Sequence, residues 1–203
     1  MFFETGITGS HRAEGLSHNP FKALVAPRPI GWISSLDAQG RANLAPYSFF
    51  NAVSDDPPIV MFSSSGWKHT VANVEATGEF VCNLATAHLQ TQLNVSSAPV
   101  AAGVDEFDLA GLEKAPSRLV RVPRVAAARA ALECRLLRIV QLEDLAGSLC
   151  GAHVVFGQVV GIHIDDAVVA NGRIDMSRLQ LLSRLGYKDY SVTSDVFEMD
   201  RPA

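Results

Sequence analysis

The most informative stretch of this chain is Ala26-Pro-Arg-Pro-Ile-Gly-Trp-Ile-Ser-Ser-Leu36, in which two prolines precede an apolar run. Residues 30–36 predict a strand, because they are mostly apolar and include β-branched and aromatic side chains. Residues 37–40, Asp-Ala-Gln-Gly, follow at once and are typical of a β-turn with glycine at its last position. We therefore expect the architecture to be built from short strands and tight turns.

Further strands are expected wherever apolar or alternating runs lie between turn signals. They are residues 41–53 (strand-like at both ends), 58–63, 79–84, 130–142 and 152–164. Gly157 and Gly161 lie inside the last of these, and glycines within a strand often mark bulges or barrel corners. The pattern predicts a mostly β protein, a sandwich or a barrel with a closed sheet and a few helices.

Two helices are expected between these strands. The first covers residues 70–76 and ends at Gly78, and the second covers residues 86–93 with Thr86 as its N-cap. Residues 1–18 are rich in Gly, Ser and His and predict an N-terminal arm. Residues 19–203 are then expected to form a single domain.

The composition is that of one globular domain. Of 203 residues, 48% are apolar and 19% charged, which argues against disorder. Seventeen Lys and Arg against 21 Asp and Glu leave a net charge of −4, which disfavours a general nucleic-acid binder. No apolar run approaches the roughly 18 residues of a membrane span, and the N-terminus lacks signal-peptide features. We therefore expect a soluble cytoplasmic protein with no membrane partner.

Several common catalytic and metal-binding patterns are missing from the sequence. It contains no G-x-G-x-x-G, G-x-x-x-x-G-K-[ST], H-E-x-x-H or G-x-S-x-G. Cys82, Cys134 and Cys150 are too scattered for a disulfide framework or a zinc site. His153 and His163 lie ten apart in one predicted strand, where a metal pair is conceivable but structural histidines are commoner. We expect no metal.

Six arginines crowd residues 118–138 against a single acid, Glu133. They lie at positions 118, 121, 124, 129, 135 and 138. A nucleic-acid stripe would have this charge but would also carry interleaved aromatic residues, which are absent here. A solvated face or a surface for intersubunit ion pairs explains the run equally well.

One group of polar residues suggests a ligand. Residues 63–65 are three serines at the end of a predicted strand, and Lys68 lies just before the helix that starts at Thr70. Backbone N–H groups at a helix N-terminus favour an anion, and a lysine and hydroxyls would add to the site. These residues alone fit a phosphate site and an ordinary Ser/Gly turn with a surface lysine equally well.

Four motifs in order resemble the flavin reductase-like family of FMN-binding split barrels. They are APRPIGWISS (26–35), GRANLAPYSFFN (40–51), DDPPIVMFSS (55–64) and K-H-T-x-x-N (68–73). The resemblance is strong over residues 19–85. The later half is similar only in its general pattern of strands and turns, including the closing segment Ser183-Arg-Leu-Gly-Tyr187.

The resemblance implies a six-stranded Greek-key split β-barrel that forms a homodimer with FMN at the subunit interface. Carried over by position, Ala45, Pro46, Tyr47 and Ser48 would line the isoalloxazine, with Asn51 close by. The phosphate would be held by Ser63, Ser64, Lys68 and Thr70, and further flavin contacts would come from Arg28, Ser34 and Ser35. This chain has His69 where many relatives carry an acid after the lysine.

The implied function is an NAD(P)H-dependent flavin oxidoreductase, in which hydride passes from nicotinamide to flavin with no catalytic side chain. This fits a sequence without a recognisable catalytic acid or base. The alternative is an electron-transfer flavoprotein, similar to flavoredoxin, that a protein partner reduces. A third possibility is an FMN-binding dimer without redox turnover. A monooxygenase component that receives reduced flavin is a further conceivable partner.

Overall fold

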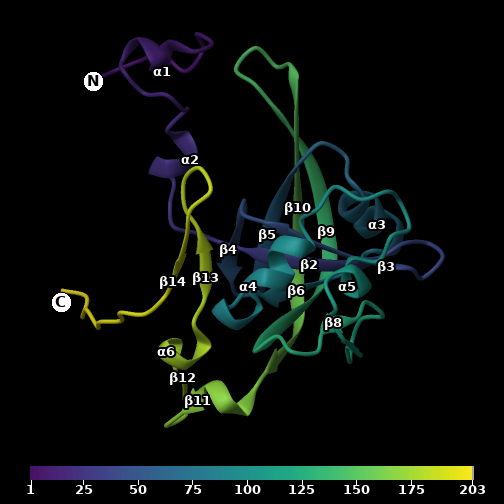
Figure 1. Ribbon diagram of the computed structural model, residues 1–203. Helices are drawn as coiled ribbons and strands as arrows, with labels where there is room; N and C mark the ends of the chain where they lie inside the picture. The colour runs from purple at the N-terminus through teal and green to yellow at the C-terminus, as the bar shows by residue number, and fades with distance from the viewer. Residues whose placement is uncertain (203) are drawn as a thin grey trace.

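The computed structural model describes residues 1–202, and its largest element is a seven-stranded antiparallel sheet (Figure 1). The strands lie in the order β3-β2-β6-β9-β10-β5-β4. Their bounds are β2 Gly31–Leu36, β3 Ala42–Tyr47, β4 Phe50–Asp55, β5 Pro58–Ser65, β6 Glu79–Leu84, β9 Ala130–Glu143 and β10 Leu149–Ile164. Each predicted strand is present, and residues 41–53 form two strands, as their strand-like ends indicated.

The sheet curls on itself because its two edge strands are consecutive in the chain. Only Ser48 and Phe49 separate β3 at one edge from β4 at the other. The Ser63 N–H donates to the Phe49 carbonyl at 2.8 Å, which ties this corner to β5. No backbone ladder joins β3 to β4 among the described residues. The mostly β split barrel is thus confirmed, but the sheet has seven strands rather than six and is not closed.

Two glycines permit the tight packing of the barrel interior. A Cβ on Gly31 would lie 2.5 Å from the Phe50 ring, and one on Gly157 would lie 2.3 Å from the Phe80 ring. The register between β9 and β10 shifts at Phe156/Gly157 and again between Val159 and Gly161. The expectation that these strand glycines mark bulges is confirmed.

The predicted helices are present with different ends. Helix α3 spans His69–Thr77 and stops at Gly78, which has φ 72°, a conformation that glycine adopts readily. The second helix is a short 3-10 turn, Ala87–Leu89, followed by α4, Gln90–Val95. Thr86 is the N-cap residue, as predicted, but its hydroxyl contacts His88 Nδ1 at 3.1 Å and makes no capping bond to a backbone N–H.

The smaller elements lie around the barrel. The N-terminal segment has α1 Ser10–Ala13 and α2 Phe21–Leu24, and α5 Glu106–Leu109 covers β3. A three-stranded sheet joins β1 Arg28–Pro29 to β13 Leu182–Arg184 and β14 Tyr190–Val192. The rest are β7 Lys114–Ala115, β8 Arg124–Val125, the 3-10 turn Asp166–Val168, β11 Val169–Ala170, β12 Arg173–Ile174 and α6 Met176–Leu179.

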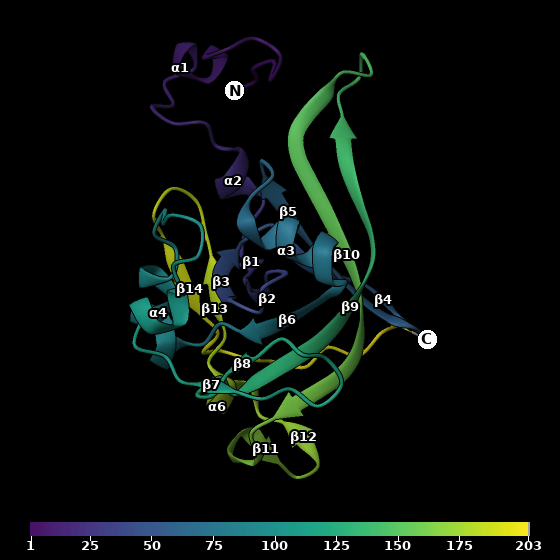
Figure 2. The same cartoon turned by 90° about the vertical axis from the view of Figure 1, so that its right-hand side faces the viewer.

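Two parts of the chain extend away from the barrel. Figures 1 and 2 show α1 away from the barrel and the β9–β10 hairpin projecting well beyond it. The division into an arm and one domain stays a prediction.

None of the helices within residues 1–202 is long and apolar enough to cross a membrane.

The core consists of side chains from both faces of the curled sheet. Phe62 packs between Tyr47 and Phe80, with ring centroids 4.8 Å and 5.5 Å apart. A second cluster lies around Trp32, which is fully buried and donates from Nε1 to Ser96 Oγ at 2.9 Å. The bond to Ser96 fixes the chain that follows α4 against the barrel.

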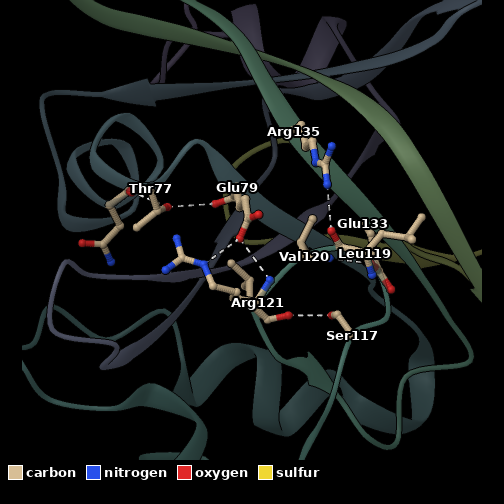
Figure 3. A network of polar contacts seen from close by, with 10 residues as sticks. Thr77, Glu79, Ser117, Leu119, Val120, Arg121, Glu133 and Arg135 are labelled. Carbon is tan, nitrogen blue, oxygen red and sulfur yellow. Dashed lines mark hydrogen bonds and ion pairs between the residues drawn. The ribbon is translucent and has the colours of Figure 1, made fainter.

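The arginine-rich segment is held by carboxylates of this same chain (Figure 3). Arg121 pairs with Glu79, and Arg129 pairs with Asp165. The buried Glu133 carboxylate accepts from three consecutive backbone N–H groups, those of residues 118–120, at 2.6–3.1 Å. Arg118 and Arg121 therefore belong to a loop that Glu133 and Glu79 hold against the sheet.

Candidate functional site

A cavity of about 570 Å³ opens at the corner between β3 and β4. Its walls come from three parts of the chain that meet there: the β3–β4 corner, the end of β5 with the start of α3, and the chain after α4. The lining residues are Asn43, Ala45 to Phe49, Ser63, Ser65, Trp67 to Thr70, Ser96 to Val100 and Glu106. The split in the barrel is thus the place where the cavity forms.

Residues 45–48 form one wall, mostly through backbone. β3 is an edge strand that pairs only with β2, so alternate backbone groups along it are free to bond a ligand. The Tyr47 side chain is buried and packs against Phe62. Burial raises the pKa of the Tyr47 phenol, whose oxygen has no hydrogen-bond partner within residues 1–202. The Tyr47 ring is therefore part of the core next to this wall.

Lys68 and the start of α3 form the opposite corner. Lys68 is exposed and is the N-cap residue of this nine-residue helix. The half-buried Ser63 and the exposed Ser65 lie in the same wall. A cation, free helix N–H groups and hydroxyls together form an anion-binding arrangement. The structure thus brings Ser63 and Lys68 to one cavity with the 45–48 wall.

Thr70 and Ser64 are less available. Thr70 lines the cavity, but its Oγ1 accepts from Asn43 Nδ2 at 3.0 Å. Ser64 is fully buried and donates to the Gly66 carbonyl at 2.8 Å. Both residues shape the turn around Lys68 with side chains that already have partners.

Ser34, Ser35 and Asn51 lie outside the cavity lining. Both serines are fully buried in β2. The Ser34 hydroxyl donates to the Pro123 carbonyl at 2.6 Å, and the Ser35 hydroxyl accepts from Asn73 Nδ2 at 3.1 Å. Asn51 is exposed on β4, where its Oδ1 accepts from the Ala52 N–H. These side chains make internal contacts and are not brought to the cavity.

The cavity also contains three residues outside the predicted ligand contacts. The exposed rings of Phe49 and Trp67 border it, and Trp67 contacts His153 edge-on at 5.0 Å between ring centroids. Glu106 is 5% exposed and accepts from the Leu44 N–H at 2.9 Å. Glu106 lies 33 positions after Asn73, the last residue of the motifs (106 − 73), so only the folded chain reveals its place.

Glu106 is the acid of this cavity. Burial raises the pKa of its carboxyl, and the nearby charge of His69 acts in the opposite direction. A carboxyl with a raised folded pKa holds its proton longer in the folded than in the unfolded protein. Its contribution to folding free energy therefore becomes less favourable as pH rises from about 4.3, the unfolded value, through the folded pKa.

We expect Glu106→Gln to be more stable than the wild type at pH 7 by about 1 kcal/mol, the scale of one partly compensated polar group. The amide oxygen still accepts from Leu44, so the difference isolates the charge. Urea unfolding at pH 4, 5, 6 and 7 measures it. The gap between the two proteins should grow with pH and then level off; a gap that shrinks with pH would contradict the assignment.

No group of three or more His, Cys, Asp or Glu side chains is arranged for a metal ion anywhere in residues 1–202. His153 and His163 have separate surroundings. His153 packs on Trp67, and the Nε2 of His163 lies 2.5 Å from Glu133. The independence from metal stays a prediction.

Comparisons with known proteins agree on one family. A family model described as "Flavin reductase like domain" matches residues 24–188. An uncharacterized protein of Aquifex aeolicus is 36% identical over 173 residues, which cover 82% of this chain and 85% of that protein.

Two solved structures are also similar. Nitrilotriacetate monooxygenase component B from Bacillus cereus has a TM-score of 0.88 and 27% identity, covering 98% of both chains. The 2-nitrobenzoate 2-nitroreductase of Pseudomonas fluorescens has a TM-score of 0.83 and 25% identity, covering 100% of this chain and 96% of its own.

Proposed function

The chain belongs to the flavin reductase-like family, and on this premise we propose that it is an FMN-binding enzyme that oxidises NAD(P)H. The family supports a flavin-binding oxidoreductase as the general class. One observation carries the finer proposal: the anion-binding corner at Lys68 and the backbone wall at residues 45–48 border the same cavity.

The cavity fits FMN in size and in chemistry. Its volume of about 570 Å³ lies within the roughly 300–1,000 Å³ of typical small-molecule sites. Lys68, Ser63 and the α3 N-terminus would hold the phosphate. The main chain of Ala45 to Ser48 would face the ring system, and Ser64 and Thr70 would support the phosphate turn.

The protein's own part in the reaction is binding and electrostatics. When bound, FMN would supply the two-electron redox chemistry, so no side chain has to act as acid or base. On the open edge of β3 the Leu44 N–H already donates to Glu106 and Pro46 has no N–H, so this edge would offer a ligand carbonyl oxygens. Phe49 and Trp67 present rings at the cavity mouth, where they would limit the access of water.

Anaerobic spectroscopy tests the proposal. The purified protein, loaded with FMN, should show a flavin absorbance that NADH or NADPH bleaches in the absence of oxygen. Bleaching by dithionite but by neither nucleotide would overturn it and favour a flavoredoxin-like carrier that a protein partner reduces. Failure to bind FMN at all would remove both functions.

Ser48 supplies a hydroxyl beside the proposed ring site. It lines the cavity and is half-buried. Ser48→Ala should shift the flavin absorbance or slow its reduction, while the unfolding free energy of the FMN-free protein changes by less than about 1 kcal/mol. An unchanged spectrum together with an unchanged reduction rate would exclude contact with the flavin.

We also propose that the protein is a homodimer with FMN bound between its subunits. The projecting β9–β10 hairpin carries exposed apolar side chains, at Leu137, Val140, Leu142, Leu145 and Leu149, which a second subunit would cover. FMN shared by two subunits would stabilise the dimer by mass action. Sedimentation at micromolar concentration should show a dimer; an FMN-loaded monomer would contradict this.

Reduced flavin has to leave or be reoxidised after each turnover. A solved structure similar to this chain is one component of a monooxygenase. We therefore propose a separate monooxygenase component as an acceptor of reduced flavin.

A further inference from the structure

A second, smaller pocket of about 290 Å³ lies next to the flavin cavity. Its walls combine α2, β1 and the loop between β13 and β14, and Figure 1 shows α2 beside that loop. Gly186 in that loop packs so closely on α2 that an added Cβ would lie 2.5 Å from the Ala23 Cβ. Pro46 and Ser48 border both this pocket and the flavin cavity, so one ligand can extend from one to the other.

The pocket is basic and its cations are not neutralised. Lys22, Arg28 and Arg184 all line it. None of the eight ion pairs formed by the described residues includes any of the three. The two guanidinium groups repel each other, since burial first and then the charge of Arg184 lower the pKa of Arg28.

Backbone carbonyls hold the two arginines in place. Arg28 is 5% exposed and donates to the carbonyls of Lys22, Val25 and Leu185, while its Nε has no partner within residues 1–202. Arg184 donates to the Tyr187 carbonyl and lies 4.4 Å from the centroid of the Tyr190 ring. Carbonyl dipoles orient these cations without cancelling their net charge, so the pocket favours an anion.

We propose that this pocket binds the diphosphate group of the nicotinamide dinucleotide, with Arg184 as its main ligand. This proposal rests on the proposed function: the larger cavity would bind FMN, and the smaller pocket would bind the diphosphate of the nucleotide. The flavin phosphate is assigned to Lys68, which lines the larger cavity and not this pocket. The exposed rings of Tyr187 and Tyr190 also line the basic pocket and offer flat surfaces for a base.

The test compares Arg184→Gln with the wild type, with Lys188→Gln as a control. Lys188 is an exposed cation of the same loop that does not line the pocket. Calorimetry should show that ADP binds the wild type and the control alike, and that Arg184→Gln binds it about 10- to 100-fold more weakly. FMN affinity and melting temperature should stay unchanged in both variants.

Kinetics provide the second measurement. Arg184→Gln should raise the KM for NADH by a similar factor and leave the rate with 1-benzyl-1,4-dihydronicotinamide, which has no phosphate, unaffected. Equal ADP binding by variant and wild type would overturn the proposal. So would a parallel loss of FMN affinity, which would assign Arg184 to the flavin, or inorganic phosphate that competes as well as ADP.

The two proposals fail in different ways. If the wild type binds ADP through Arg184 but neither nucleotide bleaches its flavin, the diphosphate pocket stands and NAD(P)H oxidation is wrong. If NADH is oxidised but ADP does not bind, NAD(P)H oxidation stands and the pocket assignment is wrong.

Discussion

Replacing Lys68 with alanine is expected to weaken FMN binding by roughly 10- to 150-fold. A hydrogen bond to a charged group contributes about 1.5–3 kcal/mol, and about 1.4 kcal/mol corresponds to a factor of ten. Lys68 is not part of any ion pair among the described residues. Its ammonium is therefore available to a phosphate, which carries about −1.5 to −2 charges near neutral pH.

Riboflavin provides the internal control for this variant, because it has the same ring system without the phosphate. Fluorescence titration should show that its affinity is nearly the same for Lys68→Ala and wild type. Lys188→Ala, which removes an exposed lysine outside the cavity, should bind both flavins normally. An equal loss for FMN and riboflavin, or no loss for either, would mean that the phosphate site lies elsewhere.

Glu133→Ala should lower the free energy of unfolding by about 3–5 kcal/mol, the usual cost of removing one partner from a buried charged network. Glu133 is 1% exposed. Its carboxylate accepts from three backbone N–H groups of the 118–120 loop and contacts His163. The loss is a large share of the roughly 5–15 kcal/mol that stabilises a typical domain. Urea unfolding measures it, with the exposed Glu143→Ala on the same strand as control.

The pH dependence identifies the charged form as the stabilising one. Burial opposes ionisation of Glu133, but the hydrogen bonds from Arg118, His163, Leu119 and Val120 outweigh it and lower the pKa of this carboxyl. Its stabilisation is therefore present above about pH 4.3, the unfolded pKa, and is lost as pH falls through the folded pKa. Glu133→Gln, which preserves the shape, should approach wild-type stability in acid; a constant difference would contradict the assignment.

Local sequence predicts much of the framework. Strand positions followed from runs such as residues 30–36 and 79–84, because alternation and turn residues act within a few positions of each other. The stop of α3 at Gly78 followed from the ease with which glycine adopts positive φ. Thr86 shows where local sequence is insufficient. A Ser or Thr hydroxyl at a helix start has several possible partners, and the Thr86 hydroxyl contacts His88 instead of a backbone N–H.

The sequence by itself determined the mostly β character, the bulges at Gly157 and Gly161, and the family, through the order of its motifs. Only the tertiary structure decided which motif residues face the cavity. Ser34 and Ser35 lie within a motif yet are buried, whereas Glu106 and Arg184 belong to none of the strong motifs and line pockets. The physical reason is that the way the edges of the sheet meet decides which side chains face the cavity and which are buried. That meeting depends on contacts between residues far apart in the chain, which local patterns do not encode.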